Sequence, residues 1–388
     1  MTLFSGQNDE GAFQKMDIEK FDKAIHLIVG DPKFLSSCQA NFQWLEPFLE
    51  SAWVIFNSYE EVDKQAVDHF LQEAKGVRSL IFVHGLWPTN KEILKFIEPS
   101  SHKTIGFLWG GDYTHDTLAF DFLYESRTRK MIQSRSRKLK RLPFFAFEIV
   151  KTIQSRLQLL ARRRRLRNSL SHIDYVVCGW GIAESRKLPV RRLRTLPSFN
   201  PYYTETAKNK NFNYGGFDER KPLAVLVGNS GTWTNNHIDV IETIRLKNPS
   251  LSITFTLLLS YGDKEYIRML EDFFEHDSEV RLVKNFLSAD DFNALVKAHD
   301  LLALGSKRQQ GSGFIRFALW NNKPILLFED SIAFSCLNEL GANMPSLDVA
   351  IDFVSLDVDV LRVQFERLQK ENTHRFQDEI QQLINGTT

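Results

Sequence analysis

The chain has 388 residues, of which 43% are hydrophobic and 25% charged, and its formal net charge is +1. This composition is typical of a folded protein and excludes a largely disordered one, and the length suits two α/β domains of ordinary size. The cysteines Cys38, Cys178 and Cys336 are far apart and odd in number, which argues against a disulfide framework and against a paired-cysteine metal site. We therefore expect a reducing compartment.

Residues 1–23 are expected to form an N-terminal extension. The first fifteen residues lack the apolar segment of a signal peptide. No run along the chain approaches the roughly 18–20 apolar residues that span a bilayer. The sequence therefore predicts a protein that stays on the cytoplasmic side of the membrane.

Short apolar runs recur along the chain with helix-length segments between them, and such runs predict buried parallel strands. The first series is expected at 24–29, 52–56, 79–84, 103–109 and 173–178, and the second at 223–227, 253–259, 280–283, 301–304 and 324–328. We predict an α/β protein of two doubly wound, Rossmann-like domains facing a central cleft. The first domain would cover 24–200 with a basic insertion at 126–168, and a linker at 201–220 would lead to the second domain at 221–388.

The first strand of the second series leads into a loop of small residues, GNSGTWTNNH at 228–237, and then into a helix. Backbone N–H groups and the positive end of a helix dipole favour a phosphate or a sugar hydroxyl there. The loop lacks the Gly-Lys-Ser/Thr of a Walker A motif and the full dinucleotide fingerprint. A plain strand-to-helix turn with Asn and Thr as caps is the alternative. The expected binding residues are Gly228, Asn229, Ser230, Gly231, Asn235, Asn236 and His237.

A second glycine-rich loop, GSKRQQGSG at 305–313, also lies between an apolar strand and an apolar helix. A departing diphosphate needs fixed donors, which Arg308, with Lys307 as a second cation, and the N–H groups near Gly311 would supply. We expect Arg308, Gln309, Gln310 and Gly311 to bind the ligand, against the alternative of an exposed, charged loop. A shared site requires this loop and the first one to converge on one pyrophosphate.

The first domain is expected to hold an acceptor and a general base. In FLWGGDYTHD at 107–116 the chain leaves a strand and presents Asp112, His115 and Asp116, and a carboxylate or imidazole can accept a hydroxyl proton. Asp112 is the first candidate, His84 the second and His115 a further one. Asp112 as a turn or capping residue, and His84 as a satisfied buried histidine, are the alternatives.

No metal ion is expected. Metal-dependent transfer from a diphosphate commonly uses an Asp-x-Asp triplet at a strand end, and this chain has that pattern only at Asp357-Val358-Asp359. The position near the C-terminus favours a helix start instead.

The stretch Arg127–Arg167 carries fifteen Lys and Arg residues and a single acid, Glu148. Within it, apolar residues recur every three or four positions and form one stripe of a helix, at Phe144, Phe147, Val150, Ile153, Leu157 and Leu160. An apolar stripe with basic ends predicts binding to an anionic membrane interface. An ordinary helix with a solvated basic face is the alternative.

The motifs GNSGTWTNNH and KRQQGSGFIRFALWNNKPILL, preceded by GFLWGGDYTHD, resemble the bacterial TDP-N-acetylfucosamine:lipid-linked-disaccharide N-acetylfucosaminyltransferases (4-α-L-fucosyltransferases) of enterobacterial common antigen assembly. The resemblance extends over roughly residues 24–345. It implies a GT-B fold, a TDP-sugar donor and a polyprenyl-diphosphate-linked acceptor. Separately, no cofactor is expected. The chain departs from the pattern of this family at Thr232-Trp233 and Leu196-Pro197-Ser198, so the identity of the donor sugar stays open. An enzyme of O-antigen or capsule synthesis would show the same motifs.

The favoured function is a metal-independent glycosyltransferase, peripheral to the cytoplasmic face of the inner membrane. Two other functions stay open. A nucleic-acid-binding protein would use the basic stretch, although its aromatic residues follow the helix stripe and do not alternate with the arginines as stacking platforms would. A non-catalytic nucleotide- or sugar-binding module would share the architecture, because fold alone does not fix function.

Overall fold

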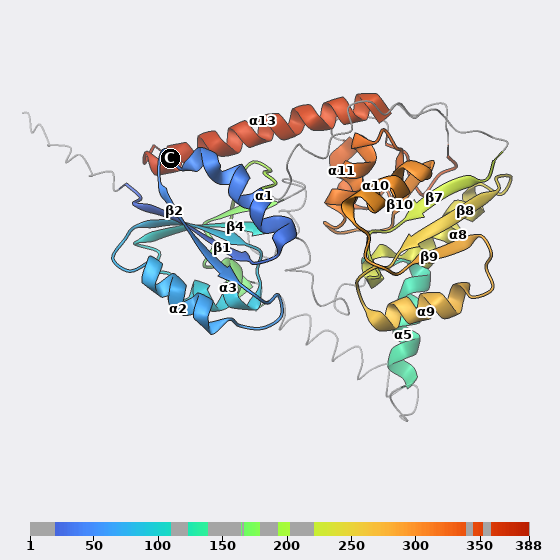
Figure 1. Cartoon of the computed structure of the whole chain (residues 1–388), viewed down its shortest axis with the longest axis horizontal. Coiled ribbons are helices and arrows are strands. Elements are labelled where there is room, and N and C mark those ends of the chain that lie inside the picture. The colour runs from blue at the N-terminus through green and yellow to red at the C-terminus, as the bar shows by residue number, and fades with distance from the viewer. Residues whose placement is uncertain are drawn as a thin grey trace, which may run out of the picture.

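The computed structural model describes residues 20–109, 123–138, 164, 167–178, 193–201, 221–338, 344–351 and 358–387. In this part of the chain the strands form two separate sheets, each covered by helices (Figure 1). The candidates Asp112 and His115, the stripe Phe144–Leu160 and most of the expected linker lie outside the described residues.

The first sheet has the order β2-β1-β3-β4-β5-β6, and all its pairs are parallel. Its strands are β1 (Lys23–Val29), β2 (Glu50–Phe56), β3 (Ser79–His84), β4 (His102–Leu108), β5 (Tyr175–Cys178) and β6 (Arg194–Thr195). The helices between them are α1 (Pro32–Phe42), η1 (Gln43–Leu45), α2 (Lys64–Glu73), α3 (Pro88–Ile93) and η2 (Leu94–Phe96).

The second sheet has the order β11-β10-β7-β8-β9 and is also parallel throughout. Its strands are β7 (Leu223–Val227), β8 (Ile253–Leu258), β9 (Val280–Val283), β10 (Leu301–Leu304) and β11 (Ile325–Leu327). Its helices are η6 (Trp233–Asn235), α8 (His237–Lys247), α9 (Lys264–Phe274), α10 (Ala289–Ala298), α11 (Ser312–Trp320) and α12 (Ile332–Asn338).

Helices cover both faces of each sheet, which explains why the strands are apolar without alternation. In β7, Val225 and Val227 belong to the apolar cluster on one face, and Leu226 belongs to the cluster on the other. The first sheet is built in the same way, because Leu27 and Ile28 of β1 enter opposite clusters. All ten strands expected from the apolar runs are present, with ends within two residues of the expected ones.

The C-terminal helix α13 (Val358–Ile384) contributes to the cores of both lobes. Its first turns place Val358, Leu361 and Phe365 in a cluster of the second sheet. Its last turns place Phe376, Ile380, Leu383 and Ile384 in a cluster of the first sheet. At 1.5 Å per residue a helix of this length spans about 40 Å, and Figure 1 shows it running along both sheets. The helix therefore joins the two lobes.

The helix α5 (Ser126–Lys138) begins the basic stretch, and it packs on the second sheet although it lies between β4 and β5 of the first. Leu123 and Tyr124, just before it, are fully buried in the cluster that holds α8 and β7, with Met131 and Ile132 packed against the same cluster. Figure 1 shows α5 next to α9 and away from the first sheet. The sequence-derived domain limits stay a prediction, but in three dimensions these residues extend the second lobe.

Candidate functional site

The connectivity of the second sheet identifies the edge where a ligand is expected. From β7 the chain proceeds to β8 on one side, whereas β10 lies on the other side of β7 and proceeds to β11. The order of strands therefore reverses between β7 and β10. In open parallel sheets, ligands bind beyond the carboxyl ends of the strands at such a point. The two glycine-rich loops leave these two strands at that edge.

The first loop, Gly228–Asn236, is held by hydrogen bonds of its own side chains. The Asn235 Nδ2 donates to the carbonyl oxygen of Ser230 at 2.6 Å and contacts Thr232 Oγ1 at 3.1 Å. Gly228 has a φ of 70°, and its amide donates to the Ala303 carbonyl of β10 at 2.9 Å. The loop is thus ordered before any ligand arrives.

A third loop, which follows β8, is fastened to the first one. The Gly231 N–H donates to the Tyr261 carbonyl at 2.7 Å, and the Asp263 N–H donates back to the Gly231 carbonyl at 3.0 Å. The Asn229 Nδ2 donates to the Tyr261 hydroxyl at 3.4 Å. A half-exposed aromatic ring therefore stands beside Asn229 at the edge of the sheet.

The second loop, Gly305–Gly311, converges with the first, as the sequence predicts. The Gln310 Nε2 donates to Asn229 Oδ1 at 3.1 Å and to Thr232 Oγ1 at 2.9 Å, and its Oε1 accepts from Thr234 Oγ1 at 2.5 Å. A Cβ on Gly311 would lie 3.4 Å from the Asn229 side chain. The amide of Gln310 therefore fastens one loop to the other.

Gly305 shows how closely the loops approach. A Cβ there would lie 2.3 Å from the Asn235 carbonyl oxygen and 2.6 Å from Val240 Cγ2, which no side chain could tolerate. The Asn236 Nδ2 adds a hydrogen bond of 2.8 Å to the Gly305 carbonyl. Two segments about seventy residues apart in sequence thus form one rigid surface.

The start of α11 is the more accessible of the two helix starts at this edge. The first N–H groups of a helix have no partner inside it, and they attract anions. The N-cap of α11 is Gly311, which has no side chain to occupy them, and Ser312 and Gly313 are partly exposed. The start of α8 differs, because His237 is fully buried and its N–H donates to the Tyr266 hydroxyl at 3.3 Å. An anion at this edge would bind to α11.

The cations of the second loop have different environments. Lys307 is 12% exposed and forms ion pairs with Glu125 and, at 2.6 Å, with Asp330. Burial lowers the pKa of Lys307, but its hydrogen bonds to Asp330 and Glu125 outweigh that effect, so the net pKa is raised and the charge is retained. Its charge is already matched by two carboxylates. Arg308, whose Nη1 donates to the Gln309 carbonyl at 2.9 Å, stays the predicted side-chain cation for an incoming anion.

His237 is neutral at physiological pH. Burial lowers its pKa to about 3, and its Nδ1 lies 3.2 Å from the Tyr266 hydroxyl. Its Nε2 faces Gly228, since a Cβ on that glycine would lie 2.5 Å away. His237 therefore supports the backbone of the first loop and supplies no positive charge to it.

His84 lies at the end of β3 and is fully buried. Its ring stacks on Phe107 with centroids 5.0 Å apart, and its Nε2 lies 3.3 Å from His26 Nδ1. Burial lowers the pKa of His84 to about 3. These contacts are those of the buried, hydrogen-bonded histidine that the sequence offered as the alternative. Its role as a base stays a prediction, as do those of Asp112 and His115.

Sequence reasoning missed Tyr261 and the segment Leu123–Thr128. An Asn-Gly-rich motif marks the first loop, but no local pattern marks a residue that reaches the site from another part of the chain. In the sequence, the pair Leu123-Tyr124 just before the basic helix indicates a buried position. An apolar pair does not reveal against which of the two sheets it packs.

Two structural observations concern ligands and membranes. Among the described residues, no group of three or more His, Cys, Asp or Glu side chains is arranged to hold a metal ion. Asp359 of the Asp-x-Asp triplet lies in the first turn of α13 and accepts a hydrogen bond from Asn322 Nδ2 at 2.9 Å. Within the same described residues, no helix is both long and apolar enough to span a membrane.

Comparison with known families gives a match at this site. Residues 187–371 match the model of 4-alpha-L-fucosyltransferase, glycosyl transferase group 56, and this region contains both converging loops. The chain is a glycosyltransferase. The match confirms the resemblance seen in the sequence motifs, which named the same family. No curated protein matches the chain.

Solved structures match this chain at low sequence identity. The glycosyltransferase resembles the OtsA apo structure with a TM-score of 0.50 and 10% identity, over 94% of this chain and 96% of that one. Anabaena Alr3699/HepE in complex with UDP matches with a TM-score of 0.48 and 13% identity, over 94% and 97% of the two chains. The glycosyltransferase SnogD from Streptomyces nogalater matches with a TM-score of 0.40 and 13% identity, over 92% of this chain and 96% of that one. The predicted α/β architecture of GT-B type is confirmed.

Proposed function

We propose that this glycosyltransferase moves a TDP-activated deoxyamino sugar, such as N-acetylfucosamine, onto a polyprenyl-diphosphate-linked oligosaccharide in bacterial surface polysaccharide synthesis. The observation that carries the proposal is the convergence of the Gly228–Asn236 and Gly305–Gly311 loops beside the start of α11. The activity that describes the matching family, that of a 4-alpha-L-fucosyltransferase, supports a fucose-type donor.

In this proposal the diphosphate of the donor lies against the first turn of α11, where N–H groups point out of the helix. Arg308 supplies the side-chain cation that stabilises the departing diphosphate as the bond to the sugar breaks. Of the predicted binding residues, Gln310, Asn235 and Asn236 act mainly by shaping the two loops, because their amides are hydrogen-bonded within them.

The acceptor and the base belong to the first lobe in this proposal, with Asp112 as the first candidate for the base. The basic stretch 126–168 would bind the anionic inner leaflet and keep the enzyme at the membrane where a polyprenyl-linked acceptor resides. Its apolar stripe with basic ends supports this localisation at the cytoplasmic face.

The test begins with thermal shift measurements in the presence of TDP, UDP, GDP and duplex DNA at moderate salt. We expect TDP to raise the melting temperature most. Turnover of TDP-N-acetylfucosamine with a polyprenyl-diphosphate-linked acceptor should then be detected by release of TDP. Binding without turnover would indicate a non-catalytic module. A shift with DNA alone, fading steeply with salt, would refute the transferase in favour of nucleic-acid binding.

Arg308→Gln is the decisive variant, and Arg268→Gln on the exposed face of α9 is its matched control. Both remove one positive charge from the second lobe. The proposal predicts a loss of turnover of about tenfold to a hundredfold for Arg308→Gln, the range for a charge-assisted hydrogen bond, and little change for Arg268→Gln. Equal activity of the two variants would show that Arg308 does not take part in the reaction.

A further inference from the structure

A segment from the first half of the chain touches both loops of the candidate site. The Leu123 carbonyl accepts from Asn236 Nδ2 at 3.0 Å, and the Glu125 N–H donates to Asn236 Oδ1 at 2.9 Å. The same Nδ2 donates to the Gly305 carbonyl at 2.8 Å. One buried amide therefore joins the segment to the first loop, which carries Asn236, and to the second, which begins at Gly305.

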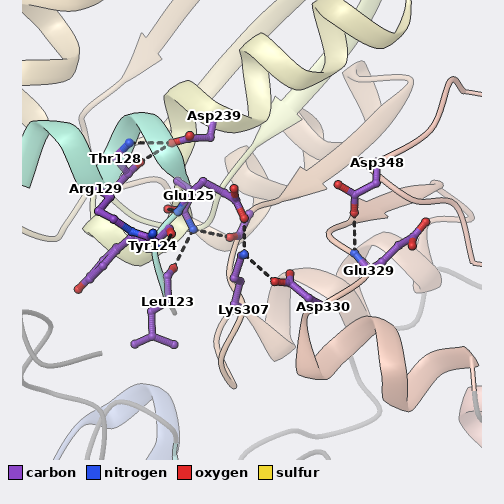
Figure 2. A network of polar contacts seen from close by, with 12 residues as sticks. Leu123, Tyr124, Glu125, Thr128, Arg129, Asp239, Lys307, Glu329, Asp330 and Asp348 are labelled. Carbon is purple, nitrogen blue, oxygen red and sulfur yellow. Dashed lines mark hydrogen bonds and ion pairs between the residues drawn. The ribbon is translucent and has the colours of Figure 1, made fainter. Parts of the chain in front are cut away.

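A second attachment is ionic and reaches the second loop directly. The Glu125 carboxylate pairs with Lys307 Nζ, which also pairs with Asp330 at 2.6 Å (Figure 2). Lys307 is 12% exposed and Glu125 28% exposed, so this pair is screened by solvent much less than an ordinary surface pair. Lys307 immediately precedes Arg308, so the position of its backbone determines where the Arg308 side chain begins.

The segment is itself firmly anchored. The Asp239 carboxylate of α8 accepts from Arg127 N at 2.7 Å, from Thr128 N at 2.9 Å and from Thr128 Oγ1 at 2.7 Å, and so caps the start of α5. Figure 2 shows Glu125 between this cap and Lys307. With Leu123 and Tyr124 buried in the core, Glu125 has a fixed base from which to hold Lys307.

We propose that Glu125 is a positioning residue of the donor site: through Lys307 it holds the second loop in the conformation that binds a nucleoside diphosphate. This inference rests on the proposed function and adds to it a residue outside the region 187–371 that matches the family. Docking of the segment Leu123–Thr128 on the second lobe then becomes a condition for donor binding.

The sign of the effect separates positioning from simple electrostatics. A carboxylate close to a diphosphate repels it, so on charge alone the Glu125→Gln variant should bind the anion more tightly. If Glu125 acts by holding Lys307, the same substitution releases the loop and weakens binding. Glutamine keeps the size of the side chain and leaves the backbone contact of Glu125 with Asn236 in place.

The experiment measures binding of TDP by isothermal titration calorimetry to the full-length wild-type protein and to the Glu125→Gln, Lys307→Ala and double variants. Glu242→Gln is the matched control, because it breaks the 2.8 Å ion pair that joins Arg127 of α5 to α8 on the exposed side. Melting temperatures are recorded for every variant, and the KM for the TDP-sugar and kcat are measured in parallel.

We expect Glu125→Gln to weaken TDP binding about threefold to tenfold, to raise the donor KM more than it lowers kcat, and to change melting no more than Glu242→Gln does. In the Lys307→Ala background the substitution should add nothing, because the partner through which it acts is gone. A Glu125→Asp variant, which retains the charge, should recover most of the binding.

Unchanged or tighter TDP binding by Glu125→Gln would overturn the inference, as would equal losses with Glu242→Gln. Full additivity of Glu125→Gln and Lys307→Ala would overturn it as well. If the wild-type protein itself binds none of TDP, UDP or GDP, the proposed function fails instead, and the two failures are therefore distinguishable.

Discussion

An alanine at position 228 would test the contact between the first loop and the buried start of α8. Gly228 has a φ of 70°, where an alanine is strained by about 1 kcal/mol. A Cβ there would also lie 2.5 Å from His237 Nε2 and 3.0 Å from its Cδ2. His237 is fully buried and stays close to Tyr266, so it can withdraw only by disturbing the core. Such overpacking lowers the free energy of unfolding by about 1–3 kcal/mol more.

Gly76 provides the matched control, because it has the same φ of 70° and nothing lies within 4 Å of the position of its Cβ. Gly76→Ala should therefore cost about 1 kcal/mol of unfolding free energy, and Gly228→Ala about 2–4 kcal/mol. In a His237→Ala background the collision is absent, and Gly228→Ala should cost only the strain.

Urea denaturation of the single and double variants measures these differences, and TDP binding measures their effect on the site. Gly228→Ala should weaken binding because the displaced loop moves away from Gln310, whereas Gly76→Ala should bind as the wild type does. Equal destabilisation by Gly228→Ala and Gly76→Ala would show that His237 does not press on Gly228, and the account of a pre-ordered first loop would be wrong.

Three further predictions concern the rest of the fold. Burial lowers the pKa of His84 from 6.5 to about 3, so between these pH values the unfolded chain binds a proton at this residue that the folded chain does not. The contribution of His84 to stability is therefore complete above pH 6.5 and falls by about 1.4 kcal/mol per pH unit toward pH 3. The buried His237 adds a similar slope, so His84→Gln should reduce the slope measured in urea titrations without abolishing it. Asp239→Ala should remove the cap of α5 and lower the free energy of unfolding by about 1–2 kcal/mol. The amides of residues 123–134 should then exchange hydrogen faster, and an unchanged exchange rate would contradict this prediction. Phe376→Ala should lower the free energy of unfolding by about 3–5 kcal/mol because this side chain is fully buried in the first lobe. Val360→Ala, on the exposed face of the same helix, should lower it little. Calorimetric melting compares the two variants, and similar losses of stability would contradict the anchoring of α13.

The sequence predicted the framework of the protein because parallel strands buried on both faces leave uninterrupted apolar runs. The exception is β6, where Arg194 and Thr195 pair with β5 through backbone hydrogen bonds and show no apolar pattern. Convergence of the two loops could also be predicted, since both follow carboxyl ends of strands in one parallel sheet.

The contacts of individual side chains could not be predicted in the same way. Asn236 and Gln310 are expected to bind the ligand because they are polar and lie in glycine-rich loops, and that role stays a prediction. In the structure their amides bond to Leu123, Gly305, Asn229 and Thr232. These partners come from distant segments, and local periodicity contains no information about them. The same holds for α5, whose basic sequence suggests exposure but does not identify the lobe that receives it.

The place where α5 docks has a consequence for exchanging parts between related enzymes. A chimera cut in the linker would separate the second sheet from Leu123 and Tyr124, which complete its core. The apolar side chains that these two residues cover would then be exposed to water. A transplanted C-terminal half would therefore aggregate unless residues 123–138 were supplied with it. A graft that transfers the proposed donor site would thus have to be non-contiguous and include this helix along with the two loops.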